Sequence, residues 1–86
     1  MVATHEIRAG ARVSGSHGER LGVVSAIRTD EISGEPSALV VKTGIWPLTR
    51  HKILSVDTIR QINNDPDTIV VNVSKREFRG IPQIKN

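Results

Sequence analysis

The side chains that most often carry chemistry are few in this sequence and widely spaced. The histidines are His5, His17 and His51, and none shares the close spacing typical of a metal site. The chain has no cysteine, so a zinc ion would need all three histidines or help from carboxylates. We therefore expect exposed polar histidines, no metal ligands and no bound cofactor.

One turn has part of the spacing of a calcium loop. Asn63, Asp65 and Asp67 occupy alternate positions, as the first ligands of such a loop do. The sixth position is Thr68 where a calcium loop has glycine, and the twelfth is Ser74 where it has a bidentate glutamate. The sequence therefore predicts a plain turn before a strand.

No pattern in the chain is typical of a catalytic centre. Nucleophilic catalysis needs a serine, cysteine or threonine beside an oriented base, and no local motif joins a serine to a histidine and an acid. Gly15 and Gly18 have the spacing of a short glycine loop, but a predicted strand follows them. A phosphate-binding loop would lead into a helix, so this segment predicts a hairpin turn. We expect no catalytic residues and no enzyme activity.

The chain is basic, with a net charge of +3. Most basic residues are spread along it with acids between them, which predicts solvated surface rather than one basic face. These are Arg8, Arg12, Arg20, Arg28, Lys42, Arg50, Lys52 and Arg60. Near the C-terminus Lys75, Arg76, Arg79 and Lys85 form a candidate basic patch, with RNA or an anionic membrane surface as its partner.

The length of 86 residues predicts a single domain, with a folded core over roughly residues 7–82. The N-terminal residues lack the apolar run of a signal peptide, and no segment approaches the roughly 20 apolar residues of a membrane span. A small secreted domain would usually carry disulfides. These features favour a cytoplasmic location.

Six short apolar or alternating segments with turn residues between them predict a mostly β chain. They cover residues 11–14, 21–29, 37–43, 50–56, 58–62 and 68–73. Gly22 within the second segment predicts a bend or bulge. Because closing a sheet removes its exposed edges, we expect a small closed or partly open antiparallel β-barrel of about six strands with a short C-terminal helix.

The helix is predicted from a capping box. Ser74 and Glu77 have the spacing at which each side chain bonds the other residue's backbone amide, so a helix over residues 75–79 is expected. Phe78 would face inward and the basic residues outward. The predicted core is Val13, Leu21, Val23, Ile27, Leu39, Val41, Ile53, Val56, Ile59, Ile69, Val71, Val73 and Phe78.

A continuous apolar loop is the candidate partner-binding site. It consists of Ile45, Trp46, Pro47 and Leu48, with Arg50 at its rim. In one interpretation Trp46 folds back and plugs an end of the barrel. In the other it is an exposed anchor for a partner or a second copy of the chain, since tryptophan is enriched among binding hot spots. The sequence leaves both open.

The order of these segments resembles the PRC-barrel domain family over roughly residues 7–82. Residues 10–24 resemble its opening hairpin, 37–42 its apolar "ALVV" strand, and 53–59 a strand with the turn after it. The segment 71–78 resembles its last strand and the start of its terminal helix. Leu54 departs from the pattern, because relatives often carry proline there.

The resemblance implies a non-enzymatic protein–protein interaction or adaptor module. Homodimerisation through the apolar loop is one expected mode, because pairing would bury surface that a small barrel leaves exposed. Domains of this family form the cytoplasmic part of the H subunit of photosynthetic reaction centres. They also form the C-terminal domain of a ribosome maturation factor that docks on a ribosomal protein. The alternative is therefore a ribosome- or RNA-associated maturation or assembly factor.

Overall fold

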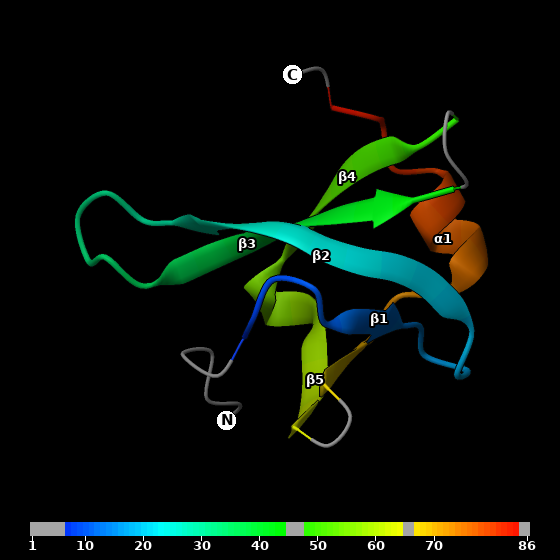
Figure 1. Ribbon diagram of the computed structural model, residues 1–86, viewed down its shortest axis with the longest axis horizontal. Helices are drawn as coiled ribbons and strands as arrows, with labels where there is room; N and C mark the ends of the chain where they lie inside the picture. Colours follow the sequence, from blue (N-terminus) through cyan, green and yellow to red (C-terminus); the bar gives the residue numbers. More distant parts are fainter. Residues whose placement is uncertain (1–6, 45–47, 65–66, 85–86) are drawn as a thin grey trace.

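The chain forms one six-stranded sheet followed by a short helix (Figure 1), as seen in a computed structural model that describes residues 7–44, 48–64 and 67–84. The elements in chain order are β1 (Arg12–Ser14), β2 (Arg20–Thr29), β3 (Pro36–Thr43), β4 (Arg50–Ser55), the 3-10 helix η2 (Val56–Thr58), β5 (Ile59–Asn64), β6 (Asp67–Val71) and α1 (Lys75–Arg79).

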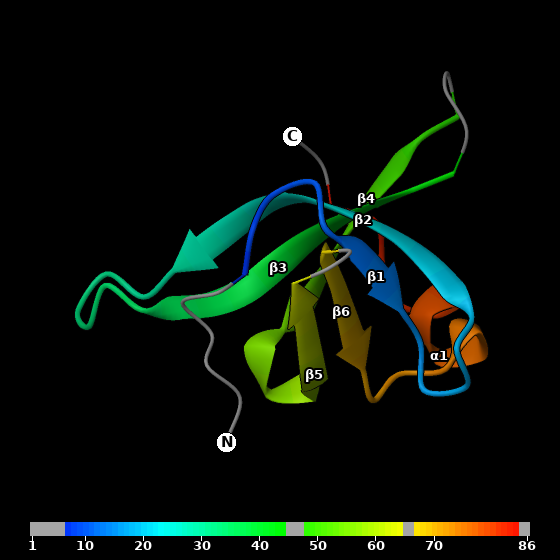
Figure 2. The ribbon, with the colours of Figure 1, turned by 60° about the horizontal axis from the view of Figure 1, so that its bottom comes forward.

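The sheet is a partly open barrel. Its strand order is β4-β3-β2-β1-β6-β5, and the two end strands, β4 and β5, are not hydrogen-bonded to each other (Figure 2). The prediction of a partly open barrel of about six strands with a short C-terminal helix is confirmed. The expectation of purely antiparallel pairing is wrong for β1 and β6, which are parallel. Both strands run towards the end of the barrel that carries α1, where the Ser16 amide donates to the Val73 carbonyl at 3.0 Å.

β2 is sharply bent by two irregularities, so its side chains do not alternate simply. Pairing with β1 skips Leu21, and pairing with β3 skips Ser25. A Cβ atom on Gly22 would collide with the Lys42 carbonyl oxygen, so glycine allows β3 to come this close. The sequence predicted a bend or bulge at Gly22, and the irregularity lies at the adjacent Leu21, whereas Gly22 itself pairs with Val13. Leu21 and Val24 both reach the core as a result, whereas Val23, predicted to be buried, is 40% exposed.

The face of β4 that packs against the core is the opposite of the predicted face. Lys52 and Leu54 are buried, and Ile53, expected in the core, is only half-buried. Pairing with β3 sets this phase, because Leu54 lies opposite Leu39 and residues directly opposite each other share one face of a sheet. Leu39 is completely buried, so the alternate positions of β4 point inward with it.

The rest of the predicted core is confirmed. The residues found buried are Val13, Leu21, Leu39, Val41, Ile59, Ile69, Val71, Val73 and Phe78, and the partly buried Ile27 and Val56 pack against them.

The capping box of α1 is also confirmed. The Glu77 amide donates to Ser74 Oγ at 3.1 Å, and the Ser74 amide donates to Glu77 Oε1 at 3.0 Å.

The far halves of β2 and β3 leave the body as a two-stranded arm. The arm and α1 lie at opposite ends of the longest axis, which measures 33 Å (Figure 1).

Candidate functional site

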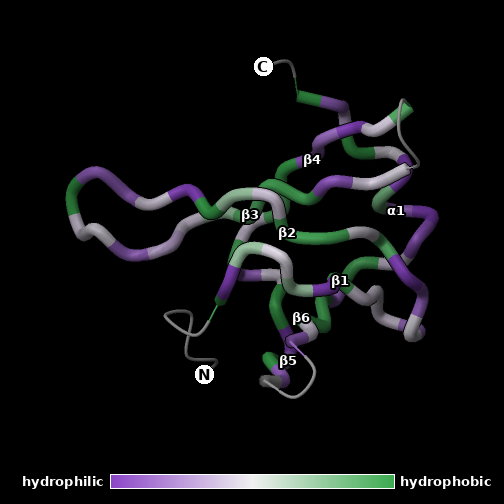
Figure 3. The backbone as a smooth tube through the Cα atoms, in the orientation of Figure 1, coloured by the Kyte–Doolittle hydropathy of each residue, from purple (hydrophilic) through white to green (hydrophobic). Residues whose placement is uncertain are grey.

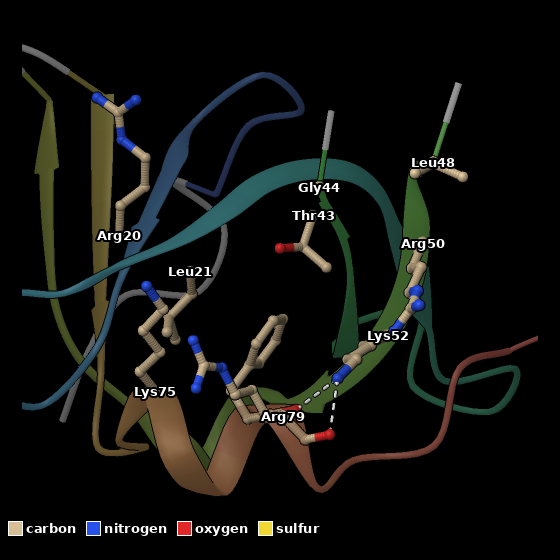
Figure 4. A pocket seen from close by; sticks show the side chains of 10 residues that line it. Arg20, Leu21, Thr43, Gly44, Leu48, Arg50, Lys52, Lys75 and Arg79 are labelled. Atoms are coloured by element: carbon tan, nitrogen blue, oxygen red, sulfur yellow. Dashed lines mark hydrogen bonds between the residues drawn. The ribbon is translucent and has the colours of Figure 1, made fainter. Parts of the chain in front are cut away.

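A pocket of about 240 Å³ lies where α1 meets the ends of β2, β3 and β4 (Figure 4). Five of its lining residues are cationic: Arg20, Arg50, Lys52, Lys75 and Arg79. The others are apolar or small and neutral: Leu21, Leu48, Phe78, Thr43 and Gly44. None of the described residues that line it is a carboxylate. A concave surface lined by one sign of charge concentrates ligands of the opposite sign, so the pocket is a candidate anion site.

Lys52 forms the inner cation of the pocket. It occupies a core-facing position of β4, and only 6% of its surface is exposed. Its ammonium donates to the carbonyl oxygens of Phe78 at 2.8 Å and Arg79 at 3.1 Å, at the end of α1 (Figure 4). The nitrogen also lies 4.9 Å from the centroid of the Phe78 ring. An ammonium has three N–H donors, and its bonds to carbonyl oxygens in the described residues use two of them.

Lys52 also positions α1. The last carbonyl groups of a helix lack partners within the helix, and a lysine that reaches them satisfies these acceptors. The same interaction fixes the helix against β4, so Arg79 on α1 and Arg50 on β4 face one hollow.

Glu19 fixes the other side of the pocket. Its carboxylate accepts from the His17 amide at 2.7 Å and from the Lys75 amide at 3.0 Å. The amide of Lys75 lowers the pKa of Glu19 most, and with the other backbone bonds and nearby His17 it brings that pKa to about 2. The carboxylate therefore stays ionised and ties the β1–β2 turn to the start of α1. Lys75 and Arg20, the first residue of β2, thus line the same pocket.

Glu19 and Glu77, which adjoin pocket residues in the sequence, do not neutralise the cations of the pocket. Glu19 bonds backbone amides, and Glu77 is held in the capping box, where the Ser74 amide lowers its pKa. The one ion pair recorded in the described parts of the chain joins His17 to Glu19 at 3.7 Å. Within those parts, the five cations have no carboxylate partner of their own.

The basic lining continues beyond the pocket. A second hollow of about 470 Å³ shares Arg20, Leu21, Thr43 and Gly44 with the first. It adds Arg12 from β1 and Lys42 from β3. Cations from four strands and the helix therefore line the two hollows, with Lys42 on the face of the sheet opposite to that of Lys52.

The structure brings the two predicted sites together. Leu48 and Arg50, predicted as part of the partner-binding loop, line the same pocket as Lys75 and Arg79 of the predicted basic patch. Leu48 is 78% exposed and forms an apolar rim.

The remaining predicted site residues lie elsewhere. Arg76 is exposed on α1 and does not line the pocket. Ile45, Trp46, Pro47 and Lys85 lie outside the described residues, so both interpretations of Trp46 stay predictions.

Sequence reasoning assigned no site to four lining residues, Arg20, Thr43, Gly44 and Lys52, and placed Leu21 and Phe78 only in the core. The spacing of Arg20, Arg50 and Lys52 along the chain predicted dispersed surface charge. The fold contradicts this, because the three side chains line one pocket. The one local signal was Lys52 inside an apolar segment, two residues before the buried Leu54.

The other sequence candidates carry no site in the described residues. His17 is exposed in its turn, and His51 is half-buried on β4. His5 and Asp65 fall outside the described ranges. No three His, Asp or Glu side chains in residues 7–44, 48–64 and 67–84 are grouped as a metal ion requires. In the same ranges no helix is long and apolar enough to cross a bilayer.

A small, partly open β-barrel with a cationic pocket at one end is the class of domain that these observations define. The family model of the PRC-barrel domain matches residues 5–78, nearly the whole chain. The chain therefore belongs to the PRC-barrel domain family, and the resemblance noted in the sequence is confirmed. A search of curated proteins found no match.

Proposed function

We propose that this chain is a protein-binding module whose pocket receives a carboxylate-bearing segment of a partner protein. The observation that carries the proposal is the convergence of five cationic side chains on a pocket that no carboxylate of residues 7–44, 48–64 and 67–84 lines. Membership of the PRC-barrel domain family is consistent with a small interaction module of this kind. We expect it to act without catalysis.

A peptide fits the lining better than a simple inorganic anion does. Leu21 and Phe78 lie among the cations, and Leu48 adds an exposed apolar rim. Interfaces commonly combine a buried apolar anchor with charged groups around it, where the charges set orientation and partner choice. A segment with an apolar residue between glutamates or aspartates would satisfy both kinds of contact.

The test measures binding of a fluorescein-labelled peptide of alternating glutamate and isoleucine by fluorescence anisotropy. The comparison peptide has glutamine in place of glutamate. We expect the wild-type chain to bind the acidic peptide, and the Arg50→Glu/Arg79→Glu variant to bind it at least about tenfold more weakly.

The matched control is Arg8→Glu/Arg60→Glu, which makes the same change in net charge at two exposed positions outside the pocket. Its affinity should stay within about twofold of wild type, since long-range charge alone contributes little at physiological salt. Equal weakening by both double variants would refute a specific pocket.

A ribosome- or RNA-associated role is the second candidate. It is favoured by the extension of the basic lining to Arg12 and Lys42, which suits a longer polyanion. Against it, single-strand binders stack bases on exposed aromatic rings, and Phe78, the aromatic residue in the described parts, is buried. An oligouridylate that binds more tightly than the peptide, with affinity falling steeply as salt rises, would favour RNA.

A further inference from the structure

The tip of the β2–β3 arm is complementary to the pocket in charge. The segment from Arg28 to Ser37 holds one arginine against Asp30, Glu31 and Glu35. At its end Ile32 is 98% exposed. Figure 3 shows the tip as a hydrophobic segment between hydrophilic ones. The arm therefore presents an apolar residue between carboxylates, which is the type of ligand that the pocket lining suits.

The tip is held in one conformation by hydrogen bonds inside the turn. Asp30 Oδ1 accepts from the amides of Ile32 at 2.7 Å and Ser33 at 3.1 Å. The backbone of Asp30 bonds that of Glu35 and of Gly34, each at 2.8 Å. Gly34 has φ of +74°, a conformation that glycine adopts without strain. Because the turn is already ordered, little conformational entropy would be lost when Ile32 enters a partner's pocket.

Glu31 and Glu35 remain available for contact. The turn uses the carboxylate of Asp30, and the amides of Ser33 and Ile32 lower its pKa. Glu31 and Glu35 are exposed, and no hydrogen bond or ion pair to their carboxylates is recorded in the described parts of the chain. Removing the exposed Ile32 side chain from water would also favour binding.

We propose that the arm tip of one copy of this chain inserts into the cationic pocket of a second copy. Ile32 would contact Leu48 and the apolar floor, while Glu31 and Glu35 would meet Arg50 and Arg79. The pocket volume of about 240 Å³ is several times the roughly 30 Å³ of one water molecule in the liquid, which leaves room for a side chain. This inference rests on the proposed function, because it assigns a partner to the same pocket.

Self-association follows from the placement of the two surfaces. The arm tip lies at the opposite end of the 33 Å axis from α1 (Figure 1), and α1 lines the pocket, so the tip of one copy cannot fill its own pocket. Each copy offers both halves of the contact, so association should increase with protein concentration. Added salt should weaken it, because exposed charges are screened.

Sedimentation velocity of the full chain over a concentration series at low salt tests the contact. We expect the mass to rise above that of the monomer, and Ile32→Ser or Glu35→Gln to weaken association at least about tenfold. Asp57→Asn is the matched control, since Asp57 is an exposed acid on η2, away from the arm, and it should associate like wild type. A chain that stays monomeric at every concentration would overturn the proposal, as would tip variants that associate normally.

A mixing experiment tests whether the two surfaces meet each other. The Ile32→Ser chain keeps an intact pocket, and the Arg50→Glu chain keeps an intact tip. Each alone should associate weakly, whereas the labelled mixture should form a mixed complex about as well as wild type associates with itself. A mixture no better than its separate components would refute the arm-in-pocket contact.

The peptide assay separates the failure of this inference from failure of the proposed function. If the chain binds the acidic peptide but stays monomeric, the self-association is refuted and the proposed function stands. If the chain neither binds the peptide nor self-associates, both are refuted.

Discussion

The two ends of the β2–β3 ribbon are held by interactions of different range. At the arm tip the hydrogen bonds join residues of the segment from Arg28 to Ser37 to one another. At the pocket Lys52 reaches residues 26 and 27 positions further along the chain, and Glu19 reaches one 56 positions away. The tip is therefore a local structure, whereas the pocket exists only if the whole barrel folds. Substitutions at the two ends should differ accordingly in their effect on stability.

The two ends also use their carboxylates differently. Glu19 and Glu77 accept from backbone amides beside the pocket, so they fix its geometry without neutralising its cations. At the tip Asp30 has the same structural role, but Glu31 and Glu35 stay exposed. The pocket cations and the exposed carboxylates of the tip therefore lie at opposite ends of the long axis. The following experiments test the comparison of the two ends.

The largest effect is expected from Phe78→Ala, which removes the buried floor of the pocket. Large-to-small changes of a buried phenylalanine cost about 3–5 kcal/mol in the free energy of unfolding. Ile32→Ala at the tip should change that free energy by less than about 0.5 kcal/mol, because the side chain is 98% exposed. Urea unfolding followed by circular dichroism measures both. Similar losses at the two positions would contradict the distinction.

Lys52→Met should have the next largest effect. The substitution keeps most of the apolar stem but removes the donor to the carbonyl oxygens of Phe78 and Arg79. We expect a loss of about 1–3 kcal/mol, the cost of leaving a buried acceptor without a partner, because the Arg79 carbonyl loses its donor while the Phe78 carbonyl still accepts from the Ile81 amide at 3.1 Å. Amide hydrogen exchange should show α1 opening more often than the strands do. An unchanged exchange rate in α1 would show that Lys52 does not hold the helix.

Gly34→Ala should disturb the tip by a smaller amount. A residue with a Cβ atom at φ of +74° is strained, at a cost of about 1–2 kcal/mol. The control is Gly80→Ala, where φ is −77° and alanine fits without strain. Thermal unfolding should therefore show a loss for the first variant and none for the second. We also expect Gly34→Ala to weaken self-association, since it displaces Ile32.

The smallest expected effect is the loss of folding stability at low pH as the Glu19 carboxylate is protonated. The folded-state pKa of Glu19 is about 2, below its ordinary value of 4.5, so its stabilisation is complete above pH 4.5. It is lost as the pH falls from about 4.5 through about 2. Glu19→Gln should flatten this part of the stability profile measured by urea unfolding, and Asp57→Asn should leave it unchanged. An equally steep profile in Glu19→Gln would assign the acid sensitivity to other carboxylates.

The apolar pattern was sufficient for most of the fold. Ile69, Val71 and Val73 alternate strictly, and all three are buried as predicted. The pattern failed where two apolar residues are adjacent. In Ile53-Leu54 either phase places one of them inside, and only the pairing of β4 with β3 chose Leu54. At Val23-Val24 the choice depended on the bulges of β2.

The candidate site was only half predictable. Leu48, Arg50, Lys75 and Arg79 were singled out as parts of two separate sites, and the fold joins them. Arg20 and Lys52 could not be assigned, because nothing in their local sequence shows that residues 32 positions apart face one pocket.

The sequence by itself determined the features that depend on neighbours in the chain. These are the capping box of Ser74 and Glu77, the turn after Asp30, and the short strands with their alternating faces. Only the tertiary structure decided the phase of β4, the parallel pairing of β1 with β6, and the convergence of five cations. The physical reason is range: turns and caps form between residues a few positions apart, whereas strand register and charge convergence depend on contacts between distant segments.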